Sequence, residues 1–212
     1  MSKIAEIPWI IEEPTKIKHQ LLNDYLGAWI SILYSNQSLI GKEKKLIYVD
    51  GFSGPGEYWA DETKSSRVNG SPILAAEKAN KYIDEDGSRK FLIIAIDSEK
   101  RCIEHLQPIL VGINKHKQEW QVLHTTFEQG MDELFGYLEA NNARIAPAFF
   151  SLIHLAIQAL PWRQCFAFLN THAQNYLSIL CIMISIDFYK QNIRKNISNP
   201  YSAPMNIKMP QV

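Results

Sequence analysis

Short apolar runs alternate with longer amphipathic segments over the first 150 residues of the chain. The runs 46–49 (LIYV) and 91–96 (FLIIAI) contain no polar alternation, which is typical of parallel strands buried on both faces. A third strand is expected at Trp120–Leu123, followed by a helix at Asp132–Leu138. This alternation of strands and helices predicts an α/β fold with a doubly wound, mostly parallel sheet.

One helix is expected before the first strand in the sequence and another after it. In residues 15–34, apolar side chains recur close to helical spacing, so this helix should cover one face of the sheet. Lys18 and His19 are expected in its solvated first turn. Ser71 and Pro72 have the residue types of an N-cap and a first helical residue, and they predict the start of a crossover helix.

A glycine-rich turn follows the first strand. Asp50 ends the strand, and three glycines follow within the sequence DGFSGPG. Glycine adopts positive φ readily and lets a ligand approach the backbone closely, which a side chain would prevent. Because ligands of open α/β sheets bind beyond the carboxyl ends of the strands, we predict a cofactor loop here. Its candidate residues are Asp50, Gly51, Phe52, Ser53, Gly54, Pro55 and Gly56.

The spacing of the glycines separates the candidate cofactors. It is neither the GxGxxG of dinucleotide-binding folds nor a P-loop, since no Gly-Lys-Ser/Thr follows. The acid, the Phe and the Gly-x-Gly resemble motif I of class I S-adenosylmethionine-dependent methyltransferases, in which the loop wraps the methionine part of the cofactor. The alternative is a glycine turn that merely joins a strand to a helix.

A second part of the candidate site follows the second strand, which ends in Asp97. One carboxylate can accept hydrogen bonds from two adjacent hydroxyls, so Asp97 is expected to bind the ribose of the cofactor. Ser98 should cap the helix that follows. Residues 57–69 form an insertion before the crossover helix, and this insertion is either a lid over the cofactor or a solvated loop.

The turn after the third strand contains His124, Thr126 and Phe127. In methyltransferases this turn meets the adenine ring, so the resemblance implies that Phe127 or Thr126 contacts adenine. His124 is expected to be an ordinary surface or core histidine rather than a catalytic one.

Four segments, taken in order, resemble one protein family. TKIKHQLLNDYLGAW, YVDGFSGPGEY, GSPILAAEKA and IAIDSEK are similar to the three-Cys-motif partner proteins, bacterial and phage proteins named for the product of a neighbouring gene. The resemblance covers about the first 150 residues. It implies a Rossmann-like, methyltransferase-like fold and a partner that carries the three-cysteine motif, but no securely known reaction. Cys102, Cys165 and Cys181 of this chain form no CxxC cluster, and no metal site is expected.

Composition agrees with a single cytoplasmic domain, which we assign to residues 1–150. The 212 residues are 46% hydrophobic, which suffices for one core, and the formal charge of +0 does not indicate nucleic-acid binding. No signal peptide is expected, because acids and prolines stand where a secretory apolar core would lie. Three cysteines without a pattern suit a reducing compartment.

Residues 151–212 differ in character from the part before them. Of the 22 acidic residues only Asp187 lies there, and the segment is apolar without a clear period. It contains no clean apolar run of the length that a membrane helix needs, about 20 residues. The family resemblance implies a fourth strand that ends in Asp-Pro-Phe-Gly after Phe150, and this motif is absent.

A shift of reading frame near Phe150 would account for this tail. If the third base of each codon is read with the first two bases of the next, the residues from Phe150 to Ala159 permit the peptide FIDPFGYSG. In the same frame the codons of Ser178 to Ile182, together with the third base of the codon before them, permit INFMY, and both peptides resemble the family. We therefore hypothesise that the C-terminal third is out of frame and that the sheet is truncated after its third strand. The alternative is a diverged C-terminal half.

Three functions are compatible with these observations. The first is a methyltransferase-like protein that binds S-adenosylmethionine, with its catalytic residues unassigned and its activity impaired by the altered tail. The second is a non-catalytic interaction partner of a three-cysteine-motif protein that retains the fold. The third, a nicotinamide-dependent enzyme, is disfavoured because GxGxxG is absent.

Overall fold

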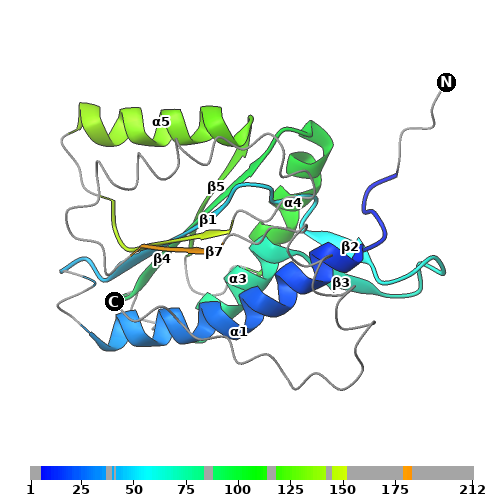
Figure 1. Cartoon of the computed structure of the whole chain (residues 1–212), viewed down its shortest axis with the longest axis horizontal. Helices are drawn as coiled ribbons and strands as arrows, with labels where there is room; N and C mark the ends of the chain where they lie inside the picture. Colours follow the sequence, from blue (N-terminus) through cyan, green and yellow to red (C-terminus); the bar gives the residue numbers. More distant parts are fainter. Residues whose placement is uncertain are drawn as a thin grey trace, which may run out of the picture.

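A parallel sheet lies between two helical layers in the computed structural model, which describes residues 6–36, 40, 42–83, 88–113, 118–141, 145–151 and 179–182 (Figure 1). The sheet has the strand order β5-β4-β1-β6-β7, and every neighbouring pair is parallel. Its strands are β1 (Lys45–Asp50), β4 (Lys90–Asp97), β5 (Glu119–His124), β6 (Ala148–Ser151) and β7 (Ile179–Ile182). Helices α1 (Glu13–Ser35), α3 (Ser71–Ala79) and α4 (Lys100–Ile113) lie on one side, and α5 (Phe127–Ala140) lies on the other. The expected α/β fold with a parallel sheet is confirmed.

The central strands are buried on both faces, as their unbroken apolar sequences indicate. In β1, Leu46 and Tyr48 belong to the larger core cluster, which includes residues of α1, α3 and α4. Ile47 and Val49 belong to a smaller cluster on the face of α5. Successive side chains of a strand point to opposite faces, which explains this division. The three strands predicted from the apolar runs coincide with β1, β4 and β5.

Helix α1 packs on the sheet along a stripe that is longer than expected. Its apolar residues Leu22 and Leu26 are buried, and the burial continues back to Lys18 and His19, which are 5% and 7% exposed. The expectation that Lys18 and His19 lie in a solvated first turn was therefore wrong. The spacing of four residues that joins Leu22 to Leu26 also places Lys18 on the buried face of the helix.

The crossover helix α3 begins one residue earlier than its sequence suggests. Gly70, rather than Ser71, is the N-cap, and Ser71 is the buried first residue of the helix. Pro72 still lies in the first turn, where its missing N–H leaves no hydrogen bond unmade.

The starts of α4 and α5 also differ from expectation. α4 begins at Lys100, so Ser98 lies two residues before it and does not hold the capping position. α5 begins at Phe127, well before the expected Asp132. The cause is a capping box, in which the Thr126 side chain accepts from the Gln129 N–H and Gln129 reaches back to the Thr126 backbone.

The insertion at residues 57–69 forms an antiparallel hairpin of β2 (Glu57–Trp59) and β3 (Arg67–Asn69). Backbone hydrogen bonds of 2.7 and 2.8 Å join Trp59 to the N-terminal segment. The tip of the hairpin, residues 61–66, is exposed, whereas Tyr58 at its base reaches the glycine loop. The tip is thus a solvated turn, and the base covers the loop.

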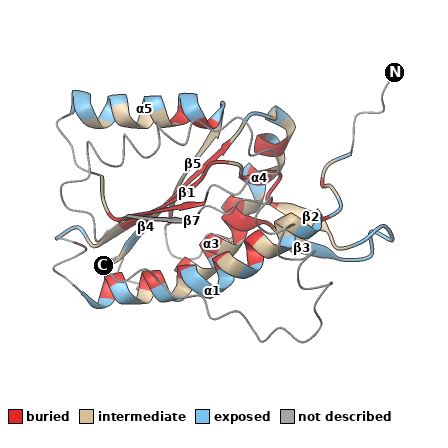
Figure 2. Cartoon of the chain, in the orientation of Figure 1, coloured by how far each residue is buried: buried red, intermediate tan, exposed pale blue. Residues whose placement is uncertain are grey.

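Among the described residues, the face of the sheet next to α5 is covered by this helix, which buries few of its side chains (Figure 2). Phe127 and Gly130 are the buried residues of α5, and the rest of this helix is intermediate or exposed. β6 and β7 extend the sheet beyond β1, so its expected end after the third strand is not confirmed. The predictions for residues 152–178 and 183–212, including Cys165, lie outside the described residues. In the described part, no helix has both the length and the apolar character to cross a membrane.

Candidate functional site

The glycine loop leaves the carboxyl end of β1, and its backbone requires glycine at two positions. The angle φ is +60° at Gly54 and +81° at Gly56, both in the left-handed region. A Cβ at Gly56 would lie 2.5 Å from Cδ1 of Leu106, which is fully buried in the larger core. Gly70 lies close to the backbone of Gly56, since its N–H donates to the Gly56 carbonyl oxygen at 2.6 Å. The second half of the loop is therefore packed between α4 and the end of β3.

Neighbouring strands hold the first half of the loop. The Gly51 N–H donates to the carbonyl oxygen of Ser151 in β6 at 3.1 Å, and the Ser53 N–H donates to the carbonyl oxygen of Ile96 in β4 at 3.0 Å. Pro55 is buried. The loop thus bridges the strands on both sides of β1, which is the region where open α/β sheets bind ligands.

Asp97 lies at the end of β4 and contacts the glycine loop directly. Its Oδ2 accepts a hydrogen bond from the Gly54 N–H, and its Oδ1 accepts one from the Glu99 N–H, each at 2.8 Å. Burial raises the pKa of the Asp97 carboxyl, and these two donors oppose that rise. Each carboxylate oxygen has two lone pairs, so both oxygens keep capacity for a ribose hydroxyl. The predicted ribose-binding residue and the predicted cofactor loop are therefore in contact.

Asp50 is fully buried and is engaged by the protein itself. Its Oδ1 accepts from the Lys18 ammonium at 2.9 Å and from the Phe52 N–H at 3.3 Å, and its Oδ2 accepts from the Tyr48 hydroxyl at 2.9 Å. Burial and the Asp50 charge raise the pKa of Tyr48 well above its usual value, which keeps this hydroxyl a donor. Asp50 thus anchors the first turns of α1 to the end of β1 through a buried ion pair.

Two buried polar side chains beside the loop lack hydrogen-bond partners among the described residues. They are His19, at both ring nitrogens, and Ser53, at Oγ. Burial, helped by the neighbouring Lys18, lowers the pKa of His19 to about 4, so its imidazole is neutral at pH 7. An unsatisfied buried polar group costs about 1–3 kcal/mol, so a polar ligand that satisfied these groups would be stabilised here.

Tyr58 completes this polar cluster. Its ring lies 5.7 Å from that of His19, and its hydroxyl oxygen occupies the space that a Cβ on Gly54 would take. Burial raises the pKa of Tyr58 well above its usual value, so the hydroxyl keeps its proton at pH 7. The space beside Gly54, which the sequence suggested was left for a ligand, is occupied by Tyr58 in this structure.

Sequence reasoning did not place Lys18, His19 or Tyr58 in the site. A signal for Lys18 was present, because it precedes Leu22 by four residues on the apolar stripe of α1. No local pattern marks Tyr58, since its approach to the loop depends on how the hairpin folds back.

The other predicted residues lie at the margin of the site or in the core. Phe127 is 5% exposed and packs against Phe52, with ring centroids 5.9 Å apart, in the cluster under α5. The side chain of Thr126 caps α5. Ser98 is exposed, and its carbonyl oxygen lies 3.1 Å from Nε2 of His124, which is exposed at the end of β5, as a surface histidine should be.

Cys102 in α4 is a buried free thiol. Burial, followed by the neighbouring Asp97 charge, raises its pKa to about 12, so the thiolate is negligible at pH 7 and the residue packs as a small apolar group. Within the described ranges, no group of three or more His, Cys, Asp or Glu side chains could hold a metal ion.

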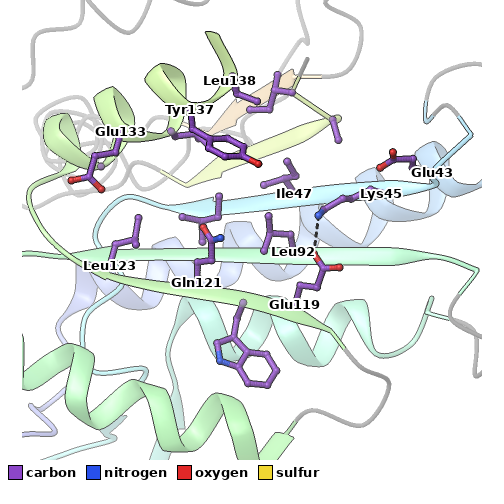
Figure 3. A pocket seen from close by; sticks show the side chains of 16 residues that line it. Glu43, Lys45, Ile47, Leu92, Glu119, Gln121, Leu123, Glu133, Tyr137 and Leu138 are labelled. Carbon is purple, nitrogen blue, oxygen red and sulfur yellow. Dashed lines mark hydrogen bonds and ion pairs between the residues drawn. The ribbon is translucent and has the colours of Figure 1, made fainter. Parts of the chain in front are cut away.

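A separate cavity of about 890 Å³ lies between α5 and the sheet (Figure 3). Its walls are mainly apolar and include Ile47, Leu92 and Leu134. The ion pair between Lys45 and Glu119, 2.7 Å long, lies at its edge, where β1 and β5 begin. The glycine loop lies at the opposite, carboxyl ends of the strands. The cavity is therefore distinct from the candidate site, and its apolar walls are typical of a sheet face that packs against another layer.

No protein-family model, curated protein or solved structure matches the chain. The structure itself defines a class, an α/β protein with a parallel sheet and a glycine loop at the carboxyl ends of its central strands.

Proposed function

We propose that this protein is a methyltransferase-like binder of S-adenosylmethionine, of the three-Cys-motif partner type. The observation that carries the proposal is the hydrogen bond between Asp97 and the Gly54 N–H. It joins the candidate ribose-binding carboxylate to the glycine loop at the carboxyl ends of adjacent parallel strands, where open α/β sheets bind nucleotides. The four ordered sequence segments support the same assignment.

In this proposal the methionine part of the cofactor lies along the loop from Asp50 to Gly56, and its ribose hydroxyls bind Asp97. The adenine lies towards Ser98 and the turn before Phe127. The cofactor, when bound, would supply a methyl group to a substrate that the described residues do not identify.

A second candidate function is a non-catalytic interaction partner that retains the fold. The observation that favours it is the internal engagement of the site, since Asp50 is paired with Lys18 and the Tyr58 hydroxyl fills the space beside Gly54. A protein that had lost its reaction would retain such contacts, because they stabilise the loop without a ligand.

The family resemblance supplies the proposed partner, and the composition and cysteine usage supply the proposed location. The partner is a protein with the three-cysteine motif that is encoded nearby, and the location is the cytoplasm. The balance of 22 basic and 22 acidic residues gives no electrostatic reason to propose nucleic acid as a further partner.

Titration calorimetry of the frame-corrected protein, alongside the purified chain, tests the proposed function. S-adenosylhomocysteine should bind and release heat, whereas NAD should not, because the loop lacks the dinucleotide fingerprint. Binding of neither ligand would contradict the first function and favour the non-catalytic partner. Binding of NAD alone would overturn both.

We further propose that the reading frame is shifted near codon 150. Among the described residues, α5 buries few side chains on this face of the sheet and an apolar cavity lies beneath it, which supports this proposal because a doubly wound sheet needs a full helical layer on each face. Sequencing the gene around codon 150 should reveal an insertion or deletion whose correction restores the Asp-Pro-Phe-Gly segment. The chain as written should bind an apolar dye strongly and be cleaved by proteases beyond Phe150, whereas the corrected chain should do neither. A protease-resistant chain with a sharp unfolding transition would restore the diverged C-terminal half.

A further inference from the structure

The polar cluster beside the glycine loop contains three side chains whose hydrogen-bonding capacity is not used by the described residues. His19 is 7% exposed and Ser53 is fully buried, and within the described ranges neither His19 ring nitrogen nor the Ser53 Oγ has a hydrogen-bond partner. The Tyr58 hydroxyl, next to Gly54, makes no hydrogen bond within the described part of the chain. Because buried polar groups in folded proteins are almost always paired, the buried and unpaired His19 and Ser53, with the half-buried Tyr58 hydroxyl close to the same loop, point to a ligand group at this place.

The electrostatics of the cluster restrict the chemistry of that group. Lys18 and Asp50, the charged neighbours of His19, form an ion pair and offset one another. His19, Ser53 and Tyr58 are themselves neutral at pH 7. A phosphate would therefore bring uncompensated negative charge into a buried place, which is costly. A group with several hydrogen-bonding atoms and no net charge fits better.

The donors and acceptors of these three side chains restrict the chemistry of the ligand group further. The Ser53 and Tyr58 hydroxyls can each donate, while a neutral imidazole offers one donor and one acceptor. A carboxylate accepts from the hydroxyls, and an ammonium donates to the unprotonated nitrogen of the imidazole. A zwitterionic amino-acid end carries both of these groups and no net charge.

We propose that His19, Ser53 and Tyr58 bind the amino-acid end of the cofactor and thereby determine its specificity. This inference rests on the proposed function, since it takes S-adenosylmethionine as the ligand. It assigns the amino-acid end to a cluster contributed by α1, the glycine loop and the hairpin, whereas Asp97 on β4 binds the ribose. The hairpin thus contributes to ligand choice through Tyr58, in addition to covering the loop.

Two ligands separate the two ends of the site. S-adenosylhomocysteine carries the amino-acid end, whereas 5′-methylthioadenosine has the same adenosine and sulfur but lacks it. Calorimetry with both ligands should be carried out on the 212-residue chain and on the variants Tyr58→Phe, Ser53→Ala and His19→Leu. Tyr137→Phe is the matched control, because this tyrosine is 65% exposed on α5, on the other side of the sheet.

The unmodified chain should bind S-adenosylhomocysteine more tightly than 5′-methylthioadenosine. Tyr58→Phe should weaken S-adenosylhomocysteine by about 10- to 100-fold, as expected for a lost hydrogen bond to a charged group, and leave 5′-methylthioadenosine unchanged within about twofold. Ser53→Ala and His19→Leu should show the same selectivity. Asp97→Ala should weaken both ligands by a similar factor, and Tyr137→Phe should weaken neither.

The possible failures are distinguishable. If neither ligand binds the unmodified chain, the proposed function and this inference both fall. If S-adenosylhomocysteine binds but Tyr58→Phe leaves its affinity unchanged, or weakens both ligands equally, only this inference is overturned. Circular dichroism of each variant identifies loss of the fold, and Tyr58→Phe, which removes a single oxygen atom, remains decisive if His19→Leu unfolds.

Discussion

Removal of the Lys18 ammonium should strongly destabilise the protein. Lys18→Met keeps the length of the side chain and deletes its charge, which leaves the Asp50 carboxylate with the Tyr48 hydroxyl and the Phe52 N–H as partners. Asp50 has no exposed surface, so water cannot replace the lost cation. An uncompensated charge would then lie at the end of the central strand.

The magnitude follows from the burial of the pair. The Lys18 and Asp50 side chains are 6% and 0% exposed, and breaking such a pair costs about 3–5 kcal/mol. The free energy of unfolding of a natural domain is about 5–15 kcal/mol, so the variant should lose a large fraction of its stability. Lys16 lies half a turn away on the same helix and pairs with Glu13 at side-chain exposures of 47% and 77%. Lys16→Met should cost less than about 1 kcal/mol.

Urea unfolding followed by circular dichroism measures these differences. The double variant Lys18→Met with Asp50→Asn removes both charges, and it should recover at least about 2 kcal/mol relative to Lys18→Met alone. The reasoning is refuted if Lys18→Met loses no more stability than Lys16→Met. The single variant Asp50→Asn is measured as well. The reasoning is equally refuted if the stability losses of Lys18→Met and Asp50→Asn simply add in the double variant, because the pair would then have no coupling energy.

Three further predictions follow from the site and its helices. The pKa of His19 is about 4 in the folded protein and 6.5 in the unfolded chain. The free energy of unfolding should therefore fall as the pH is lowered through this window, and at pH 5 it should be about 2 kcal/mol lower than at neutral pH. An equal pH dependence of unfolding in His19→Asn would contradict this. Asp97→Ala should weaken S-adenosylhomocysteine binding by about 1–3 kcal/mol in calorimetry, and a loss of thermal stability alone would make Asp97 a loop-fixing residue. Gly56→Ala combines positive φ with a contact to Leu106 and should cost about 1–3 kcal/mol in urea unfolding. Gly136→Ala, on the exposed face of α5 with no atom within 4 Å of the added Cβ among its described neighbours, should instead add up to about 1 kcal/mol of stability; a gain at both glycines would contradict the steric argument.

The strands and the glycine loop could be predicted from sequence because their causes are local. An unbroken apolar run such as residues 46–49 has few alternatives to a doubly buried strand, and the glycines after it supply the positive φ found at Gly54 and Gly56. The helix starts were less accurate, since Ser98 has the residue type of a cap but the turn places it one residue too early.

The polar half of the site could not be predicted because its causes are long-range. Lys18 was assigned to solvent since a charged residue in a first turn usually is solvated, and only Asp50, 32 residues away, makes its burial favourable. Tyr58 reaches Gly54 because residues 57–69 pair as a hairpin, which no turn motif in that segment announces. Contacts of this kind depend on tertiary geometry, which overrides residue preference.

The strand order has a consequence for the order of synthesis. β1 is made first but lies in the middle of the sheet, so its two edges are completed at different times, by β4 and later by β6. Until Ala148–Ser151 leaves the ribosome, one edge of β1 exposes unpaired N–H and C=O groups, which are prone to pair with other chains. A frame change upstream of codon 148 would leave that edge permanently open. One just after codon 151 would spare the whole ladder between β1 and β6, so that the nascent chain could close its central strand before the altered residues are translated.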